Sequence, residues 1–153
     1  MRPNLPTPIV KILTFQARRF AWRPHAKSLP EAGDAPRAGD SPPDQAVDDA
    51  VVAFVHAEPK DTAPEAAERA LRHAVKHVPW LANKRALERV VLHSFTHRAS
   101  ETADAAFAER FLADLGAKLA KKGFAVSATP FGYTCAWDLS VFGESLAKVW
   151  KEI

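Results

Sequence analysis

The sequence predicts a single α/β domain with a mixed β-sheet and two main helices. Short apolar runs rich in β-branched and aromatic residues alternate along the chain with two longer segments of helical periodicity. The chain has 153 residues, of which 47% are hydrophobic, and this is enough to bury one core. The expected order of elements, β-β-β-α-β-α-β-β, favours at least one right-handed parallel crossover through a helix. We therefore expect residues 1–153 to form one domain.

Two strands are expected before the first long loop. Residues 9–15 form an apolar, β-rich run, which predicts a largely buried strand. Residues 19–23 alternate between polar and apolar, which predicts a second strand with one face in water. The segment from Pro24 to Pro43 contains five prolines, counting both ends, and such a segment cannot form a central strand or a helix interior. We predict a proline-rich loop over residues 24–49, which is long enough to be either mobile or a lid over a site.

A central strand and a first helix are expected next. Residues 50–57 are apolar almost throughout, as is typical of a strand buried on both faces. Thr62 and Glu65 have the spacing of a capping box, and Pro64 falls in the first turn, where its missing N–H costs nothing. Pro79 is expected to end the regular helix. Its apolar positions are Ala67, Leu71, Ala74, Val75 and Val78.

A second amphipathic helix is predicted from about Ser100 to Lys122. Gly123 is a natural residue to follow its C-terminus. The apolar stripe of this helix is Ala103, Phe107, Phe111, Leu115 and Leu119. The remaining expected elements are strands at 89–95, 124–127 and 135–141, a turn at 130–132, and a short closing helix at 145–150.

Several classes of function do not fit this composition. No apolar run approaches the roughly 18 residues that span a bilayer, and the N-terminus has no signal-like apolar region. A single cysteine cannot form an internal disulfide, so a cytoplasmic setting is expected. The six glycines never have the spacing of a phosphate-binding or dinucleotide-binding loop, and we expect no cofactor.

Metal binding is also not expected. His93 and His97 are four residues apart, but the first is predicted in a strand and the second in a loop. His73 and His77 have the same spacing on the first predicted helix, where they could bind a metal or form part of a polar helix face. Neither pair has a third ligand nearby in the sequence.

The N-terminal part of the chain is basic. Up to Arg37 there are seven lysines and arginines against two carboxylates, although the net charge of the whole chain is only +3. Arg18, Arg19 and Arg23 could therefore contact phosphates of a nucleic acid. The alternative is that they form the solvated face of a strand.

Two residues have the chemistry of candidate catalytic groups. His97 lies in a polar loop that follows a predicted buried strand, where it could be a hydrogen-bond donor or a general base. Alternatively, the same loop has the pattern of a helix N-terminus, with Ser100 as the N-cap and Glu101 at the positive end of the helix dipole. Cys135, the only cysteine, is either a small buried apolar residue or a nucleophile activated by a nearby base.

Functional sites in such sheets form beyond the strand ends, where loops converge. Three predicted loops could meet in this way: the loop after Val55, the loop at 95–100 and the loop at 129–135.

Three blocks of the sequence match one known family in the family's order. They are Val52-Ala53-Phe54-Val55, Ser94-Phe95-Thr96-His97-Arg98-Ala99-Ser100-Glu101 and Thr129-Pro130-Phe131-Gly132-Tyr133. With these blocks the chain resembles the archaeal-type editing domain of threonyl-tRNA synthetase, a relative of D-aminoacyl-tRNA deacylase. The resemblance covers nearly the whole chain and fits the Pro24–Pro43 loop worst.

The resemblance implies an activity and a site. The family hydrolyses serine wrongly attached to threonine tRNA, and an RNA hydroxyl and backbone groups do much of the chemistry. By resemblance, backbone groups near Ala57, Phe95 and Phe131 hold the aminoacyl group, with Gly132 in the same turn. His97 matches the pocket histidine of the family and Tyr133 matches its tyrosine.

The chain departs from the family pattern around this expected pocket. Thr134 stands where the family usually has tyrosine, Cys135 where it has lysine, and Lys148 where it often has glutamate. A neutral thiol offers almost none of the hydrogen bonds of a lysine, so Lys148 could supply the lost charge from another side.

Two functions are therefore expected as alternatives. One is a trans-acting aminoacyl-tRNA deacylase, since the 153 residues hold no synthetase catalytic or anticodon-binding domain. The other is a non-catalytic module that binds the tRNA 3′ end, an amino acid or a protein partner. The resemblance also implies a homodimer.

Overall fold

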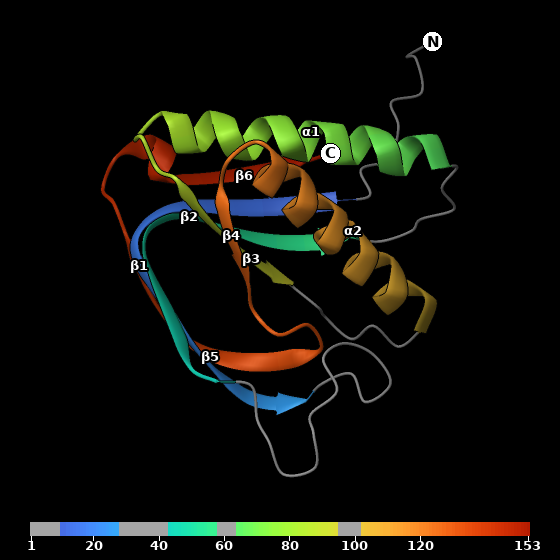
Figure 1. Cartoon of the computed structure of the whole chain (residues 1–153), viewed down its shortest axis with the longest axis horizontal. Helices are drawn as coiled ribbons and strands as arrows, with labels where there is room; N and C mark the ends of the chain where they lie inside the picture. The colour runs from blue at the N-terminus through green and yellow to red at the C-terminus, as the bar shows by residue number, and fades with distance from the viewer. Residues whose placement is uncertain (1–9, 28–42, 58–63, 95–101) are drawn as a thin grey trace.

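The computed structural model describes residues 10–27, 43–57, 64–94 and 102–153. They form a single α/β domain with one six-stranded mixed sheet and two long helices, as the sequence predicts (Figure 1). The sheet has the order β4-β3-β2-β1-β5, and β6 also pairs with β1. The elements are β1 (Val10–Lys27), β2 (Gln45–Ala57), α1 (Pro64–Asn83), β3 (Arg89–Ser94), α2 (Thr102–Lys121), β4 (Ala125–Ala128), β5 (Tyr133–Val141), the short 3₁₀ helix η1 (Ser145–Ala147) and β6 (Lys148–Glu152).

The direction of the strands divides the sheet into two parts. Strands β2, β3 and β4 are parallel, and α1 and α2 supply the crossovers between them. Strand β1 runs antiparallel to β2, and on its other side it pairs with β6 along its first part and with β5 along its second part. Strand β2 lies between β1 and β3, which confirms the central position that its apolar run predicts.

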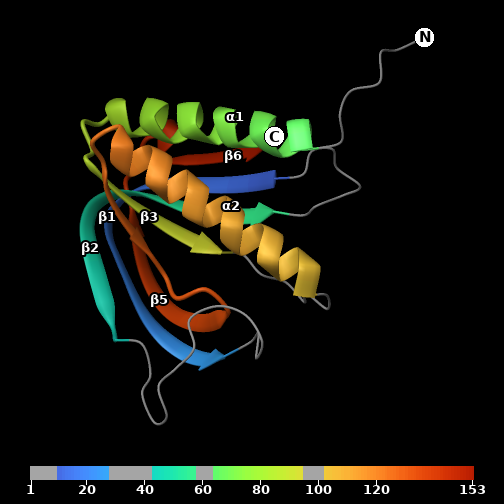
Figure 2. The same ribbon diagram turned by 45° about the vertical axis from the view of Figure 1, so that its right-hand side comes forward.

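Both helices cover the same face of the parallel strands (Figures 1 and 2). Phe111, Leu115 and Leu119 of α2 are buried there, which confirms these three positions of the predicted stripe, and Leu81 of α1 is fully buried. The strands contribute alternate residues to this core, because successive side chains of a strand point to opposite faces. These strand residues include Val10, Ile12, Val51, Ala53, Val55, Val90 and Leu92.

The opposite face is covered by the sheet itself. Strands β1 and β2 bend strongly, so that the second part of β1 and strand β5 fold beneath the parallel strands (Figure 2). A second core lies inside this curl, and Phe20 contacts Trp22, Phe54 and Trp137 with ring centroids 5.5–6.2 Å apart. Its buried members are Ala17, Phe20, Trp22, Ala50, Val52, Phe54 and Val91.

A local irregularity near the middle of β1 keeps apolar side chains inside the curl. Ala17 belongs to the inner core at an odd position, whereas Phe20 and Trp22 belong to it at even positions. The register with β5 shifts between Ala17 and Arg19, as in a β-bulge. On the neighbouring strand, Asp49 has the unusual φ of 49°. The irregularity between Ala17 and Arg19 therefore reverses which positions of β1 face inward, just where the sheet bends.

The N-terminal predictions need two corrections. The two strands expected at 9–15 and 19–23 are one strand, β1, because the bulge lets the chain bend without leaving the sheet. The loop predicted over 24–49 is shorter at both ends, since β1 continues to Lys27 and β2 begins at Gln45. Pro24 is tolerated because the pairing of β1 with β2 ends at Trp22, and because the register with β5 shifts again beside it. Residues 28–42 of this loop lie outside the described residues.

Two predicted helix ends are also wrong. Helix α1 continues through Pro79 to Asn83, because Leu81 and Ala82 are fully buried and hold the last turn on the core. The amide of Gln16 donates to the carbonyl oxygen of Leu81 at 2.9 Å, which anchors the same turn to β1. The predicted closing helix at 145–150 is only the short η1, because Lys148–Glu152 pair with β1 as strand β6.

The second half of the chain otherwise follows the prediction. The other strands agree within a few residues, and Gly123 follows α2 with a φ of 102°. Within the described ranges, no helix is long and apolar enough to cross a membrane.

The bend predicts a backbone preference at Asp49. We expect Asp49→Val to lower the free energy of unfolding by about 1–2 kcal/mol, because a β-branched residue is strained at positive φ. Asp49→Gly should keep or raise it by up to about 1 kcal/mol. Urea unfolding measures both changes, with Gln45→Val, an exposed position of the same strand, as the control. Equal stability of the Asp49 variants would contradict this role.

Candidate functional site

The parallel strands end together at one edge of the sheet. Ser94 near the end of β3 pairs with Val55 of β2, and Ala128 at the end of β4 pairs with Leu92 of β3. The N–H of Thr129 continues this ladder by donating to the carbonyl oxygen of Leu92 at 3.0 Å. The segments after β2, β3 and β4 therefore leave from the same edge, as expected from the sequence.

His93 links two of these segments. Its Nδ1 lies 2.8 Å from the hydroxyl oxygen of Thr129, the buried residue that follows β4. Its ring meets the edge of Phe54 with centroids 5.1 Å apart. Burial lowers the pKa of His93 to about 4, so its imidazole is neutral at physiological pH. A neutral imidazole has one donor and one acceptor nitrogen, and the Thr129 contact occupies one of them.

Aromatic side chains line the inside of the curl next to His93. The rings of Phe54 and Trp137 lie 5.3 Å apart, which joins β2 to β5 across the curl. Trp137 keeps 45% of its surface exposed, whereas Phe54 keeps 3%. The inner core therefore reaches solvent at Trp137, while the Phe54 ring that contacts both Trp137 and His93 is buried.

The turn between β4 and β5 is fixed from both sides. The Phe131 side chain is buried in the core beneath the helices, and Gly132 has a φ of 83°, which favours glycine. Tyr133 begins β5 opposite Lys27, and the Thr134 hydroxyl donates to the carbonyl oxygen of Ala26 at 3.2 Å. The anchored Phe131 ring leaves the backbone of this turn, rather than its side chain, to contact a ligand.

Cys135 lies in β5 opposite Pro24 and packs against the inner core. Burial raises the pKa of its thiol, so the thiol is protonated at neutral pH. This environment is the opposite of the one that activates a cysteine nucleophile.

The predicted compensation of Cys135 by Lys148 has no geometric support. Lys148 pairs with Phe15 in the first part of β1, whereas Cys135 pairs with Pro24 near its other end. Lys148 is also exposed and sits on an edge strand.

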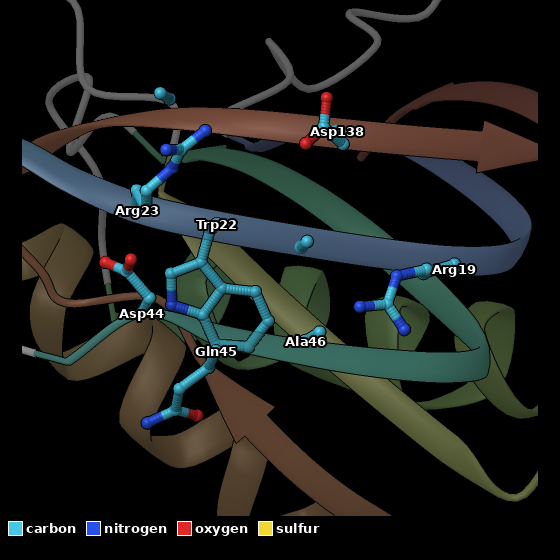
Figure 3. A pocket seen from close by; sticks show the side chains of 9 residues that line it. Arg19, Trp22, Arg23, Asp44, Gln45, Ala46 and Asp138 are labelled. Carbon is cyan, nitrogen blue, oxygen red and sulfur yellow. The ribbon is translucent and has the colours of Figure 1, made fainter.

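The three arginines of β1 are exposed but do not form one patch. Arg19 makes an ion pair with Asp48 at 3.0 Å. Arg18 lies over the ring of Phe142. The guanidinium carbon of Arg85 also lies over this ring, 3.5 Å from its centre. Arg23 lines a hollow of about 390 Å³ on the outer face of the curl, together with two carboxylates (Figure 3). The remaining residues of that hollow are Arg19, Ala21, Trp22, Asp44, Gln45, Ala46, Ala136 and Asp138.

The segments that follow β2, β3 and β4 leave from one edge of the sheet, and we call this region the strand-end site. The hollow is separate from it. The hollow borders Trp22 of the inner core, but neither His93 nor Phe54 lines it. The mixture of two arginines and two carboxylates leaves it with no strong preference for an anion.

The structure describes only part of the predicted site. Ala57 ends β2, and Phe131 and Gly132 lie in the turn that leaves the same sheet edge. Phe95 and His97 lie outside the described residues. Sequence reasoning did not select His93, Thr129 or Trp137 as site residues. The sequence feature that could have identified His93 is its position near the end of a buried strand.

The histidine pair on α1 is not a polar face. His77 is buried and lies 3.1 Å from the hydroxyl of Thr14, and its ring stacks on Trp80. Burial lowers its pKa, and the nearby positive charge of Lys151 lowers it further. His73 is exposed. Among the described residues, no three His, Cys, Asp or Glu side chains come close enough to hold a metal ion.

The buried His93 predicts a pH dependence of stability. Its folded pKa of about 4 lies below the ordinary value of 6.5, so the unfolded chain binds more protons between these pH values. The contribution of neutral His93 to the free energy of unfolding is therefore complete above pH 6.5. It is lost as the pH falls towards 4, by up to about 3 kcal/mol. Urea unfolding from pH 4 to 7 measures this, and His93→Gln should flatten the slope while His73→Gln should not. Equal slopes for wild type and His93→Gln would contradict it.

The packing of Cys135 predicts slow alkylation. Because the chain has one cysteine, the rate of reaction with iodoacetamide reports on this thiol alone. We expect the folded protein at pH 7 to react more slowly than the urea-unfolded chain, since burial raises the pKa and limits access. A faster reaction of the folded protein would mean an activated thiolate.

Comparison with known proteins shows what this chain is similar to. The family model for the archaea-specific editing domain of threonyl-tRNA synthetase matches residues 10–153. A threonine–tRNA ligase of Hyperthermus butylicus is 27% identical over 143 residues, which cover 92% of this chain and 22% of the ligase. The threonine–tRNA ligases of Thermococcus kodakarensis and Pyrococcus horikoshii are each 32% identical over 108 residues, which cover 70% of this chain and 17% of each ligase.

The chain thus spans about a fifth of the length of these curated relatives. The family match begins at the first residue of β1 and ends at the last residue of the chain, so it includes every strand and both helices. The chain therefore belongs to the family of archaea-specific editing domains of threonyl-tRNA synthetase.

Proposed function

We propose that this protein is a cytoplasmic aminoacyl-tRNA deacylase that acts in trans on the ester of a mischarged tRNA. Seryl-tRNA(Thr) is the default substrate, because editing in a threonyl-tRNA synthetase removes serine. The family match over residues 10–153 is the observation that carries the proposal. The convergence of three segments at one edge of the sheet supports it, since a tRNA 3′ end could enter there.

The proposed reaction is hydrolysis of an ester. Water attacks the carbonyl carbon, the carbonyl oxygen becomes an oxyanion, and the ribose oxygen leaves and takes up a proton. The backbone N–H of Phe131 is suited to stabilise the oxyanion, because the turn is anchored at Thr129, whose own N–H donates to Leu92, and by the buried Phe131 ring. An RNA hydroxyl near the ester can orient the water, in which case few protein side chains need to react.

Several side chains receive proposed roles in this scheme. His97 is proposed as the hydrogen-bonding group or general base of the pocket, and Phe95 and Ala57 as backbone contacts of the aminoacyl group. Cys135 is proposed as part of the pocket wall, since its raised pKa disfavours attack by a thiolate. Tyr133 and Thr134 are proposed to line the same end of β5.

The altered pocket favours a change in selectivity. In the described part of the curl, the side chains near Phe54 and Trp137 are aromatic or apolar, and Cys135 adds no charge there. An apolar wall discriminates weakly among small side chains, whereas a lysine would hold a polar group in one orientation. Substrates other than serine are therefore part of the proposal.

A second candidate function is binding without catalysis. The packing of a protonated thiol where the family has a lysine favours this alternative, because it removes a charged group from the expected pocket. Such a module would bind a charged tRNA without accelerating the loss of its amino acid.

A homodimer is proposed on the resemblance alone. Static light scattering of the purified chain measures the mass directly, and a monomer at micromolar concentration would contradict it.

The decisive test is deacylation by the purified chain alone. We expect hydrolysis of seryl-tRNA(Thr) at least about tenfold faster than the spontaneous rate, and a panel of other aminoacyl-tRNAs gives the selectivity. Cys135→Ala should keep activity within about threefold, whereas His97→Ala should lose about tenfold or more.

Each outcome separates the alternatives. Full loss of activity in Cys135→Ala, in a protein that still folds, would make the thiol a nucleophile. Binding of charged tRNA with no turnover across the panel would favour the binding module and contradict the deacylase.

A further inference from the structure

Helix α1 carries a basic face that the strand-end site does not use. Between Arg69 and Leu87 the sequence contains five lysines and arginines and no aspartate or glutamate. Along this stretch, charged and aromatic residues recur at spacings of three or four, which places them on one side of a helix. We call this set the α1 basic face: Arg69, Arg72, His73, Lys76, Trp80 and Lys84.

The α1 basic face points to solvent. Arg72, Lys76 and Lys84 are exposed, and Trp80 keeps 45% of its surface exposed. Within the described ranges, no ion pair is made by Arg72 or Lys76. The ammonium of Lys84 lies 5.5 Å from the centre of the Trp80 ring, so a flat apolar surface accompanies the charges. The opposite face of α1 packs on the sheet, where His77 contacts the hydroxyl of Thr14.

The arginines of β1 are poorer candidates for binding an anion. Arg19 is neutralised by Asp48, and Arg18 lies over an aromatic ring. Arg23 shares its hollow with Asp44 and Asp138 (Figure 3). The α1 basic face has no such carboxylates between its first and last members.

The direction of α1 relates this face to the strand-end site. Helix α1 follows β2, so its N-terminus lies towards the edge where the parallel strands end, and the helix then runs back along β6 (Figures 1 and 2). From Arg69 to its last residue, Asn83, it covers about 21 Å at 1.5 Å per residue, and Lys84 follows directly. An RNA whose 3′ end enters the strand-end site could therefore lay several phosphates along the helix.

We propose that the α1 basic face binds the phosphate backbone of the acceptor arm of tRNA, with Trp80 as a stacking surface. Positive side chains that track a backbone, accompanied by an exposed aromatic ring, are the usual elements of sequence-independent RNA binding. This inference rests on the proposed function for the identity of the RNA, but the binding it describes needs no catalysis.

The test uses uncharged RNA, so that binding is measured apart from hydrolysis. The probe is a fluorescein-labelled RNA hairpin with the length of an acceptor arm and a single-stranded 3′ end, and anisotropy gives its Kd at 50–200 mM KCl. The variant is Arg72→Ala/Lys76→Ala/Lys84→Ala. Its control is Lys118→Ala/Lys121→Ala/Lys122→Ala, which removes three exposed charges from the end of α2.

We expect the α1 variant to raise Kd at least about tenfold at 100 mM KCl and the control to stay within about threefold. The slope of log Kd against log salt should fall by about 2 in the α1 variant, because each lost phosphate contact contributes about 0.7–0.9. Trp80→Phe should lose most of the RNA-induced change in tryptophan fluorescence. If the chain deacylates tRNA, KM should rise in the α1 variant at unchanged kcat.

Equal weakening in both triple variants would overturn the inference, because it would show only an effect of net charge. Absence of RNA binding by wild type would also overturn it, as would a changed oligomeric mass of the α1 variant, which would assign the face to a protein contact. RNA binding through α1 without deacylation would support the inference while contradicting the proposed deacylase. Deacylation by wild type, with an unchanged KM in the α1 variant, would support the proposed deacylase and contradict the inference.

Discussion

The curl of β1 is the constraint on which the rest of the molecule depends. One strand of 18 residues pairs with β2 along most of its length and with β6 and β5 in turn on its other side. The bulge beside Ala17 and the positive φ of Asp49 let both strands bend there while their apolar residues stay inside. A sheet that folds over itself can bury two cores with only two helices. A flat sheet would leave Phe20, Trp22 and Phe54 in water, and their burial stabilises the fold by several kcal/mol.

The same curl creates the candidate site. It brings β5 beneath the parallel strands, so that Trp137 meets Phe54 and the turn after Thr129 starts at the edge where β2 and β3 end. The contact between His93 and Thr129 ties β3 to this turn, and burial keeps the imidazole neutral. The site is thus formed mainly by backbone and apolar groups. Such a site suits a reaction in which the RNA supplies reactive groups and the protein positions the ester.

Local patterns predicted much of this fold, and tertiary constraints account for the errors. The run at 50–57 and the stripe of α2 depend on their own periodicity, so both were predictable. The single strand β1 was not, because a bulge reverses the alternation and Pro24 falls where β2 no longer pairs. Pro79 inside α1 is explained by tertiary contacts of the last turn, where Leu81 and Ala82 are buried and Gln16 bonds to the Leu81 carbonyl. For the site, the turn at 130–132 was visible in sequence. The roles of His93 and Trp137 depend on contacts between distant strands, and Lys148 could not be placed without knowing that its segment is an edge strand.

The central claim is that the aminoacyl end of a tRNA binds where the parallel strands end, inside the opening of the curl. Backbone amide NMR with a non-hydrolysable 3′-seryl-amino-adenosine tests it most directly. We predict that the largest shift changes fall on His93, Ser94 and the turn from Thr129 to Gly132, with smaller changes at Trp137. Shift changes centred on Arg23, Asp44 and Asp138 in the outer hollow, or none up to millimolar ligand, would contradict this account.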